Sequence, residues 1–146
     1  MTHDRAPDDI TLTPSERLRA RLLSALDGPV AAHGWTAIAL RAAAEEAGLS
    51  AGEVTLAAPN GIDDMLDAFA DRADQAMLAA LGQMDLLSMR VRERVTAAVR
   101  ARIEAQQPHR PMVQAAARAL VDPRRSAAAG RLSWRTADRI WRALGD

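Results

Sequence analysis

The sequence predicts an all-α protein of about seven helices whose N-terminal part is a helix-turn-helix. Its composition is 49% hydrophobic but only 3% aromatic, so the apolar residues are mostly Ala, Leu, Val and Met, which favour helices over strands. These residues recur at intervals of three and four, and glycines and capping residues separate the runs. A chain of 146 residues also suits one compact domain with its own core.

The first predicted helix follows a polar, acidic stretch, residues 1–12, which we expect to be a disordered leader and not a signal peptide. Residues 13–16, Thr-Pro-Ser-Glu, supply an N-cap, a proline at the first helical position and the Glu of a capping box. Gly34 is expected to end this helix, with a bend at Gly28. Its apolar stripe has a spacing of four: Leu18, Leu22, Leu26 and Val30.

A helix-turn-helix follows, so that residues 13–61 form a three-helix segment. Residues 36–47 predict a second helix, and Gly48 stands where a left-handed residue ends a helix. Ser50 and Glu53 form a second capping box, which starts a short helix that ends before residues 59–61, Pro-Asn-Gly. A helix, a glycine turn and a short capped helix are typical of this motif.

Residues 62–146 predict a helical core with helices at 62–81, 89–106, 109–121 and 124–144, the second capped by Ser88. On the first, we expect Asp63, Asp67, Asp71 and Asp74 to form a solvated face, because no other element offers the oxygens of a cation site. On the last, the residues expected to point inward are Ala127, Trp134, Ala137, Ile140, Trp141 and Leu144.

The charge distribution opposes DNA binding, although the net charge is zero. Residues 1–87 carry eight more acids than arginines, and residues 88–146 carry eight more arginines than acids. The short recognition helix, residues 50–58, has no Arg, Lys or aromatic residue, whereas binding to a duplex depends on cations that neutralise phosphates. A transcriptional regulator stays the alternative, with backbone contacts from Arg17, Arg19, Arg21 and Arg41.

The residue types needed for catalysis are mostly missing. The chain has no Cys and no Lys, its three His are scattered, and it has neither an HExxH motif nor a glycine-rich phosphate loop. We therefore predict no catalytic residues, no metal, no cofactor and no enzymatic activity. No run of 18 apolar residues is present, so we expect a soluble, cytoplasmic protein.

Two resemblances carry the functional prediction. The segment from Arg17 to Asp74 resembles the N-terminal domain of the TetR regulators. GWTAIALRAAAEEAGL and above all WRTADRIWRALGD, within residues 13–146, resemble the ubiquinone-biosynthesis accessory lipid-binding family, the ninth Coq protein. This second resemblance implies a TetR-like fold, usually dimeric, that binds isoprenoid quinone intermediates and assists the diiron hydroxylase acting on demethoxyubiquinone.

Family members continue past the Gly-Asp that stands here at residues 145–146, so the resemblance implies a C-terminus that is shortened in this sequence. Docking of the hydroxylase and stable membrane binding are both placed largely in that further stretch. We expect the helices at 89–106 and 124–144 to leave apolar faces open, and oligomerisation or domain exchange to cover them.

The predicted lipid-contacting residues are inward positions of the helices at 62–81, 89–106 and 124–144, for which ordinary core packing is the alternative. They are Met65, Phe69, Met77, Leu81, Leu86, Leu87, Val95, Val99, Ile140 and Trp141. A second set is expected to face an anionic membrane surface at the inner side of the cytoplasmic membrane. It comprises Arg124, Arg125, Arg131, Arg135, Arg139 and Arg142, with Asp138 as an alternative partner for Arg142.

Overall fold

A computed structural model describes residues 11–145, and this part of the chain contains helices and no strand, which confirms the all-α prediction. The helices form two compact units that divide after Leu66, and each unit is considered by itself. The sequence placed a boundary five residues earlier, at 61/62. Most of the expected disordered leader lies outside the described residues.

The first unit begins with helices α1 (Pro14–Ser24) and α2 (Asp27–His33), where the sequence predicted one continuous helix. The capping box is present: the Glu16 carboxylate accepts a hydrogen bond of 2.7 Å from the backbone N–H of Thr13. The chain breaks before Asp27 because Pro29 has no N–H to donate, and it is accommodated in the first turn of a new helix. Gly34 ends α2 with φ of 72°, as predicted.

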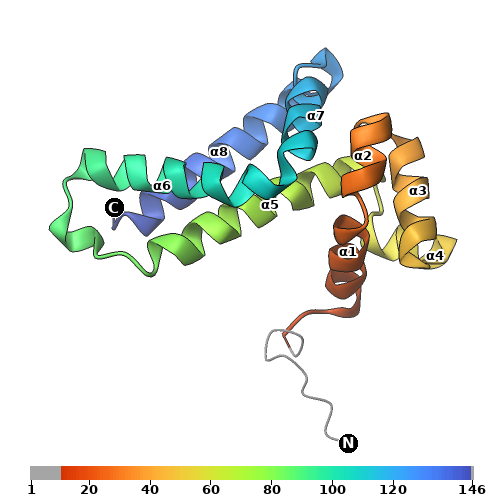
Figure 1. Ribbon diagram of the computed structural model, residues 1–146, viewed down its shortest axis with the longest axis horizontal. Helices are drawn as coiled ribbons and strands as arrows, with labels where there is room; N and C mark the ends of the chain where they lie inside the picture. The colour runs from red at the N-terminus through yellow and green to blue at the C-terminus, as the bar shows by residue number, and fades with distance from the viewer. Residues whose placement is uncertain (1–10, 146) are drawn as a thin grey trace, which may run out of the picture. The chain divides into compact units, whose positions relative to one another are not determined.

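The helix-turn-helix consists of α3 (Ala37–Ala47) and α4 (Ala51–Ala57), and Figure 1 shows α4 turned away from the axis of α3. Gly48 has φ of 68° between them, and Ser50 and Glu53 form the predicted capping box. Both signals are local, which explains why the sequence placed this motif correctly. Helix α1 packs on α3 and α4, and α2 packs on α3. The larger buried side chains of this unit are Leu22, Leu26, Val30, Trp35, Met65 and Leu66.

The second unit contains most of α5 (Ile62–Leu81), followed by a short 3-10 turn, η2 (Leu86–Ser88), and α6 (Val91–Gln106). The bounds of α5 agree with the prediction. The predicted Ser88 cap is wrong: the Ser88 hydroxyl donates to the Asp85 carbonyl oxygen at 2.9 Å within η2. Helix α6 begins instead after Arg90, whose backbone N–H donates to the Glu93 carboxylate at 2.8 Å.

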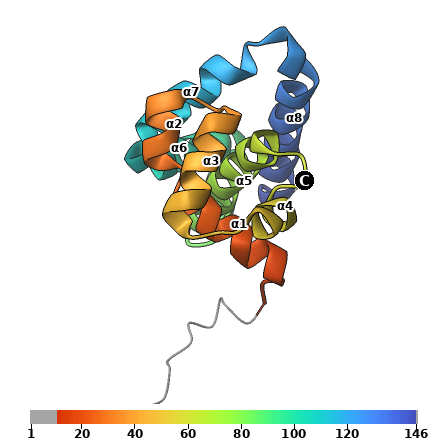
Figure 2. The same ribbon diagram turned by 90° about the vertical axis from the view of Figure 1, so that its right-hand side faces the viewer.

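The turn η3 (Gln107–His109), α7 (Arg110–Leu120) and the turn η4 (Pro123–Arg125) lead to α8 (Ser126–Ala143). Figure 1 shows α5, α6 and α8 lying lengthwise beside one another, and Figure 2 shows α6 and α8 on different sides of α5. One apolar cluster joins the three helices. Its members are Met77, Leu81, Ala98 and Ala101, with Leu78, Ala80, Leu86, Ala97, Ile140 and Ala143 partly buried against them.

The predicted inward face of α8 is largely wrong. Trp134 is 75% exposed, Trp141 is 51% exposed, and Ala127 and Ala137 are exposed as well. Leu144 is buried as predicted, Ile140 is half-buried, and Leu132, which the prediction omitted, is buried. The helix is rotated in this way because its inner side carries arginines that pair with α5.

Candidate functional site

The acidic stripe of α5 pairs with the basic stripe of α8. Arg135 Nη1 lies 2.6 Å from Asp67 Oδ1, and one turn further Arg139 Nη1 lies 2.6 Å from Asp71 Oδ1. The residues are spaced by four on both helices, so successive turns of α5 meet successive turns of α8. These ion pairs fix how far α8 is rotated and shifted along α5.

Asp74 is the centre of this arrangement and is completely buried. Its carboxylate accepts hydrogen bonds from Arg102 Nε on α6 at 2.8 Å, and from Thr136 Oγ1 at 2.9 and 3.0 Å and Arg139 Nη1 at 3.1 Å on α8. A buried carboxylate is tolerated only when its charge and lone pairs are satisfied in this way. Asp74 therefore connects α5, α6 and α8 through one side chain.

The charged form of the Arg139 guanidinium is stabilised by its partners on α5. Burial of its guanidinium opposes the charged form, but the hydrogen bonds and charges of Asp71 and Asp74 outweigh that effect and raise the pKa of Arg139. The side chain is 24% exposed, and Arg135 is 27% exposed. The prediction that these two arginines face an anionic membrane is therefore wrong, because carboxylates of the same chain bind them.

The prediction of a solvated acidic face on α5 is wrong for Asp74, and it holds only in part for Asp67 and Asp71, which are 30% and 42% exposed. The sequence did contain a signal for this pairing, since the acidic spacing of α5 matches the arginine spacing of α8. A match between distant segments becomes visible only when the helices are known to be neighbours.

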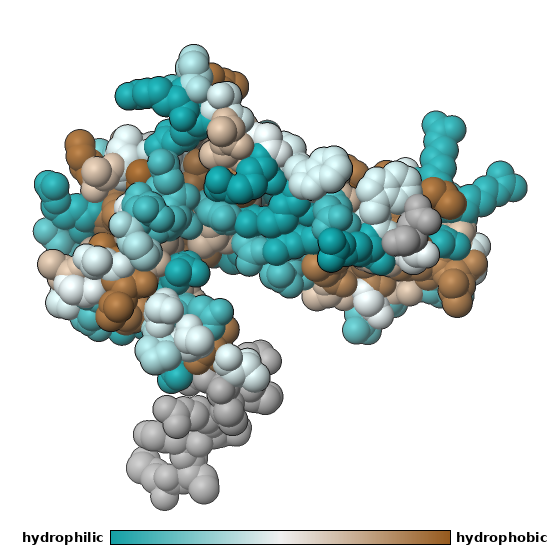
Figure 3. Space-filling model, turned by 180° about the vertical axis from the view of Figure 1, so that it is seen from behind, coloured by the Kyte–Doolittle hydropathy of each residue, from teal (hydrophilic) through white to brown (hydrophobic). Residues whose placement is uncertain are grey.

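The remaining arginines of the predicted membrane-facing set lie closer to solvent. Arg142 Nε pairs with Asp138 at 3.0 Å, which was the predicted alternative, and its side chain is 77% exposed. Arg124 pairs with Asp122 at 2.8 Å, Arg125 is half-buried, and Arg131 is exposed. Figure 3 shows hydrophilic residues in a band along this unit, with hydrophobic residues along its lower edge.

The predicted lipid-contacting residues are divided among different environments. Met77, Leu81, Leu86 and Ile140 come together in the core cluster of the second unit. Met65 and Phe69 are buried elsewhere on α5, and Val95 is half-buried. The prediction of an inward position is wrong for three residues that are exposed by 89%, 45% and 51%: Leu87, Val99 and Trp141.

An open apolar groove of about 360 Å³ lies between α5 and α6. Small side chains make it possible, because alanines on both helices leave room above the buried cluster. The lining consists of Ala76, Ala80, Met84, Ala97, Arg100, Ala101, Glu104 and Ala105. None of these alanines was among the predicted lipid-contacting residues, which were large apolar side chains, whereas a groove forms where side chains are small.

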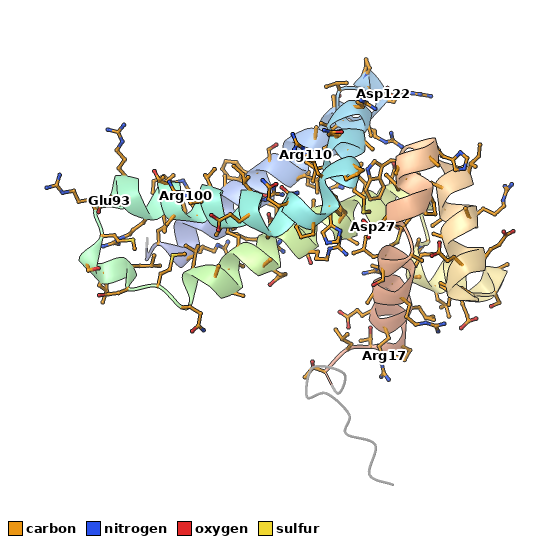
Figure 4. The ribbon with its side chains drawn as sticks, in the orientation of Figure 1. Arg17, Asp27, Glu93, Arg100, Arg110 and Asp122 are labelled. Carbon is orange, nitrogen blue, oxygen red and sulfur yellow. The ribbon has the colours of Figure 1, made fainter. Side chains whose placement is uncertain are left out.

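A second hollow, of about 500 Å³, lies on the outer side of α6. Its walls are Val95, Thr96, Val99, Arg100, Ile103 and Glu104. Arg100 and Glu104 line both hollows and so separate them, and neither side chain has a hydrogen bond or ion pair with another residue of 11–145. Figure 4 labels Arg100 midway along α6 and Glu93 at its first turn.

The helix-turn-helix presents a surface poor in cations. On α4, Ala51, Gly52 and Thr55 are exposed, and Leu56 is 59% exposed. Two of the arginines that a transcriptional regulator would use to contact the DNA backbone donate hydrogen bonds within this unit instead. Arg19 Nε donates to the Ala57 carbonyl oxygen at 2.9 Å, and Arg21 Nη2 donates to the Ala47 carbonyl oxygen at 2.8 Å. They tie α1 to the ends of α4 and α3.

Over the described range, no group of three His, Asp or Glu side chains is arranged to hold a metal ion. None of the helices in that range combines the length and the apolar character that crossing a bilayer requires. The chain matches no protein-family model and no curated protein sequence.

Proposed function

We propose that the chain is a non-enzymatic lipid-binding protein that holds an isoprenoid quinone intermediate of ubiquinone biosynthesis and assists the demethoxyubiquinone hydroxylase. The observation that carries the proposal is the α5–α6 groove, whose walls are alanines and one methionine apart from Arg100 and Glu104. The resemblance of WRTADRIWRALGD to the accessory family supplies the class of lipid.

The groove suits a flexible tail more than a rigid polar molecule. Its volume is at the small end of the range for ligand sites, and it is open along one side, so a tail would lie in it lengthwise. Met84 at one end adapts its shape easily because its side chain is unbranched. Arg100 and Glu104 offer a hydrogen-bond donor and an acceptor to the oxygens of a quinol or quinone ring.

The ion pairs between α5 and α8 also favour the α5–α6 groove as the site of the lipid. A chamber between these helices would have to accommodate a lipid beside Asp74 and its arginines, and burying charged groups against hydrocarbon is costly. The lining of the α5–α6 groove contains no such ion pair: apart from Arg100 and Glu104 of α6 it consists of alanines and Met84, and the Asp74–Arg102 pair that joins the same two helices is not part of it.

The test is lipid occupancy of the purified protein, measured by native mass spectrometry and by organic extraction. Ala76→Trp should block the groove, because Ala76 is an exposed residue of its wall and a larger side chain there leaves the core intact. Ala79→Trp is the matched control, since Ala79 is exposed on the same helix and does not line the groove. Equal occupancy in both variants would contradict the proposal.

We further propose peripheral membrane contact through the outer side of α8. Trp134 and Trp141 are seven residues apart on this helix and exposed, and Arg131 and Arg142 are exposed beside them. Tryptophan favours the bilayer interface and arginine favours anionic headgroups. Flotation with vesicles containing anionic phospholipid should recover the protein, and Trp134→Ser together with Trp141→Ser should abolish recovery.

A further inference from the structure

The 500 Å³ hollow on the outer side of α6 differs in chemistry from the α5–α6 groove, although the two share a wall. Its apolar part consists of three β-branched residues with a spacing of four: Val95, Val99 and Ile103. Such side chains are stiff, so they form a surface of fixed shape. Three polar side chains, those of Thr96, Arg100 and Glu104, complete the lining. Mostly apolar walls with a few polar groups are typical of sites for small molecules.

The groove suits a different part of a ligand. On the α5 side its lining residues, Ala76, Ala80 and Met84, follow one another at intervals of one turn, about 6 Å each. Alanines and a flexible methionine offer space to a hydrocarbon chain but no hydrogen bond. The only polar side chains of the groove lining, Arg100 and Glu104, also belong to the hollow, whereas Thr96 lines the hollow alone. A ring with oxygen substituents therefore has more polar partners in the hollow than in the groove.

We propose that the hollow on α6 is the subsite for an oxygen-bearing ring, quinone or quinol, whose prenyl tail lies in the α5–α6 groove. The connection between ring and tail crosses α6 between Arg100 and Glu104, which are one turn apart. Neither side chain is paired within residues 11–145, so both can turn aside without breaking an ion pair. Their methylene groups line the crossing while their charged ends stay in water.

The polar groups of the hollow serve both forms of the ring. The Arg100 guanidinium donates to a quinone oxygen, and the Glu104 carboxylate accepts from a quinol hydroxyl. The Thr96 hydroxyl already donates to the Arg92 carbonyl oxygen at 3.0 Å, which leaves its oxygen to accept as well. Val99 and Ile103 are 45% and 54% exposed, so a ring on them remains open to an enzyme while the tail is held. This inference rests on the proposed function and adds the position of the ring.

Isothermal titration calorimetry of the lipid-stripped protein with two separate probes tests the proposal. One probe is a tail-free dimethoxy-methyl-benzoquinone, and the other is farnesol, an isoprenoid chain without a ring. The quinone cannot add to a thiol or a lysine, because the chain has neither Cys nor Lys. Val99→Asp should weaken benzoquinone binding by roughly tenfold, because it places a carboxylate on the apolar surface, and should leave farnesol binding unchanged. Ala76→Trp, in the groove, should weaken farnesol binding alone.

Val91→Asp is the matched control, since Val91 is 57% exposed on the same helix, lies outside the hollow and accepts an acid in the first turn of α6. It should leave both probes unaffected. Normal farnesol binding by Val99→Asp shows that this variant is folded.

In NMR spectra, benzoquinone should shift the amide signals of residues 95–104. Shifts elsewhere, or equal benzoquinone binding by the wild type and Val99→Asp, would overturn the proposal. Benzoquinone binding that weakens as the protein concentration rises would also overturn it, because self-association would then cover the hollow. If farnesol alone failed to bind the wild type, the groove of the proposed function would be refuted and the ring subsite would stand.

Discussion

The helix-turn-helix and the α5–α8 unit are both helical, but different interactions fix their geometry. In the first, the ends of α3 and α4 are set by Gly48 and by the capping box of Ser50 with Glu53, residues that are close in the chain. In the second, the carboxylate of Asp74 joins residues 28 to 65 positions away in the sequence. The helix ends of the first region depend on local signals, whereas the packing of the helices in the second depends on long-range ion pairs.

The largest expected effect comes from breaking the long-range network. Asp74→Ala leaves Arg102 and Arg139 without their shared buried partner, and removal of one member of a buried ion pair costs about 3–5 kcal/mol. Urea denaturation followed by circular dichroism gives the change in the free energy of unfolding. Hydrogen exchange should accelerate in α6 and α8 first.

Asp71→Asn is the matched control on the same helix. Asp71 is 42% exposed and, among residues 11–145, pairs with Arg139 alone, so its replacement should cost no more than about 1 kcal/mol. If the two variants lost equal stability, burial of Asp74 would not explain its importance.

The corresponding change in the helix-turn-helix should have a smaller effect. Ser50→Ala removes the side-chain oxygen that accepts from the backbone N–H of Glu53 at 3.2 Å, and loss of such a cap costs about 1 kcal/mol. The same urea experiment measures it, with Thr55→Ala on the exposed side of α4 as the control. A cost as large as that of Asp74→Ala would contradict the distinction between the two regions.

A further effect is expected at low pH, in the turn between α7 and α8. The side chain and the backbone N–H of Arg124 donate to Asp122 and lower the pKa of that carboxyl from 3.8 to about 2. Because the folded-state pKa is lowered, the stabilisation is complete above pH 3.8 and disappears as the pH falls through about 2. An NMR titration of the carboxyl carbon should show this midpoint, and Arg124→Ala should raise it.

The smallest effect is expected on the outer surface of the first unit. Glu45 and Glu46 are exposed at the end of α3, so Glu45→Lys with Glu46→Lys should change stability by no more than about 0.5 kcal/mol. Lipid occupancy should stay the same, because the proposed groove lies on α5 and α6. Loss of lipid in this variant would show that the acidic end of the helix-turn-helix takes part in binding.

Most helix bounds could be predicted because they depend on neighbouring residues. The signals that act within one turn of helix are two capping boxes, Thr13 with Glu16 and Ser50 with Glu53, and two terminal glycines, Gly34 and Gly48. The prediction for α5 was correct at both ends. The break before α2 was missed because Pro29 can either bend a helix or start a new one, and the apolar spacing of four continues across it.

The rotation of each helix could not be predicted in the same way. Tryptophans at positions 134 and 141 indicated an inward face of α8 by hydrophobicity alone, yet pairing of Arg135 and Arg139 with α5 turns them outward. Likewise, the groove depends on alanines from two helices, which carry no signal until the helices lie side by side. These outcomes depend on which segments become neighbours.

The sequence by itself determined the helical composition, the caps and turns, and the lack of cations on the recognition helix, since each is a property of residues within a few positions of one another. Only the tertiary structure decided that the acids of α5 are partners for the arginines of α8. Coulombic attraction between charges a few ångströms apart, strengthened where water is excluded around Asp74, then outweighs the tendency of each stripe to face solvent.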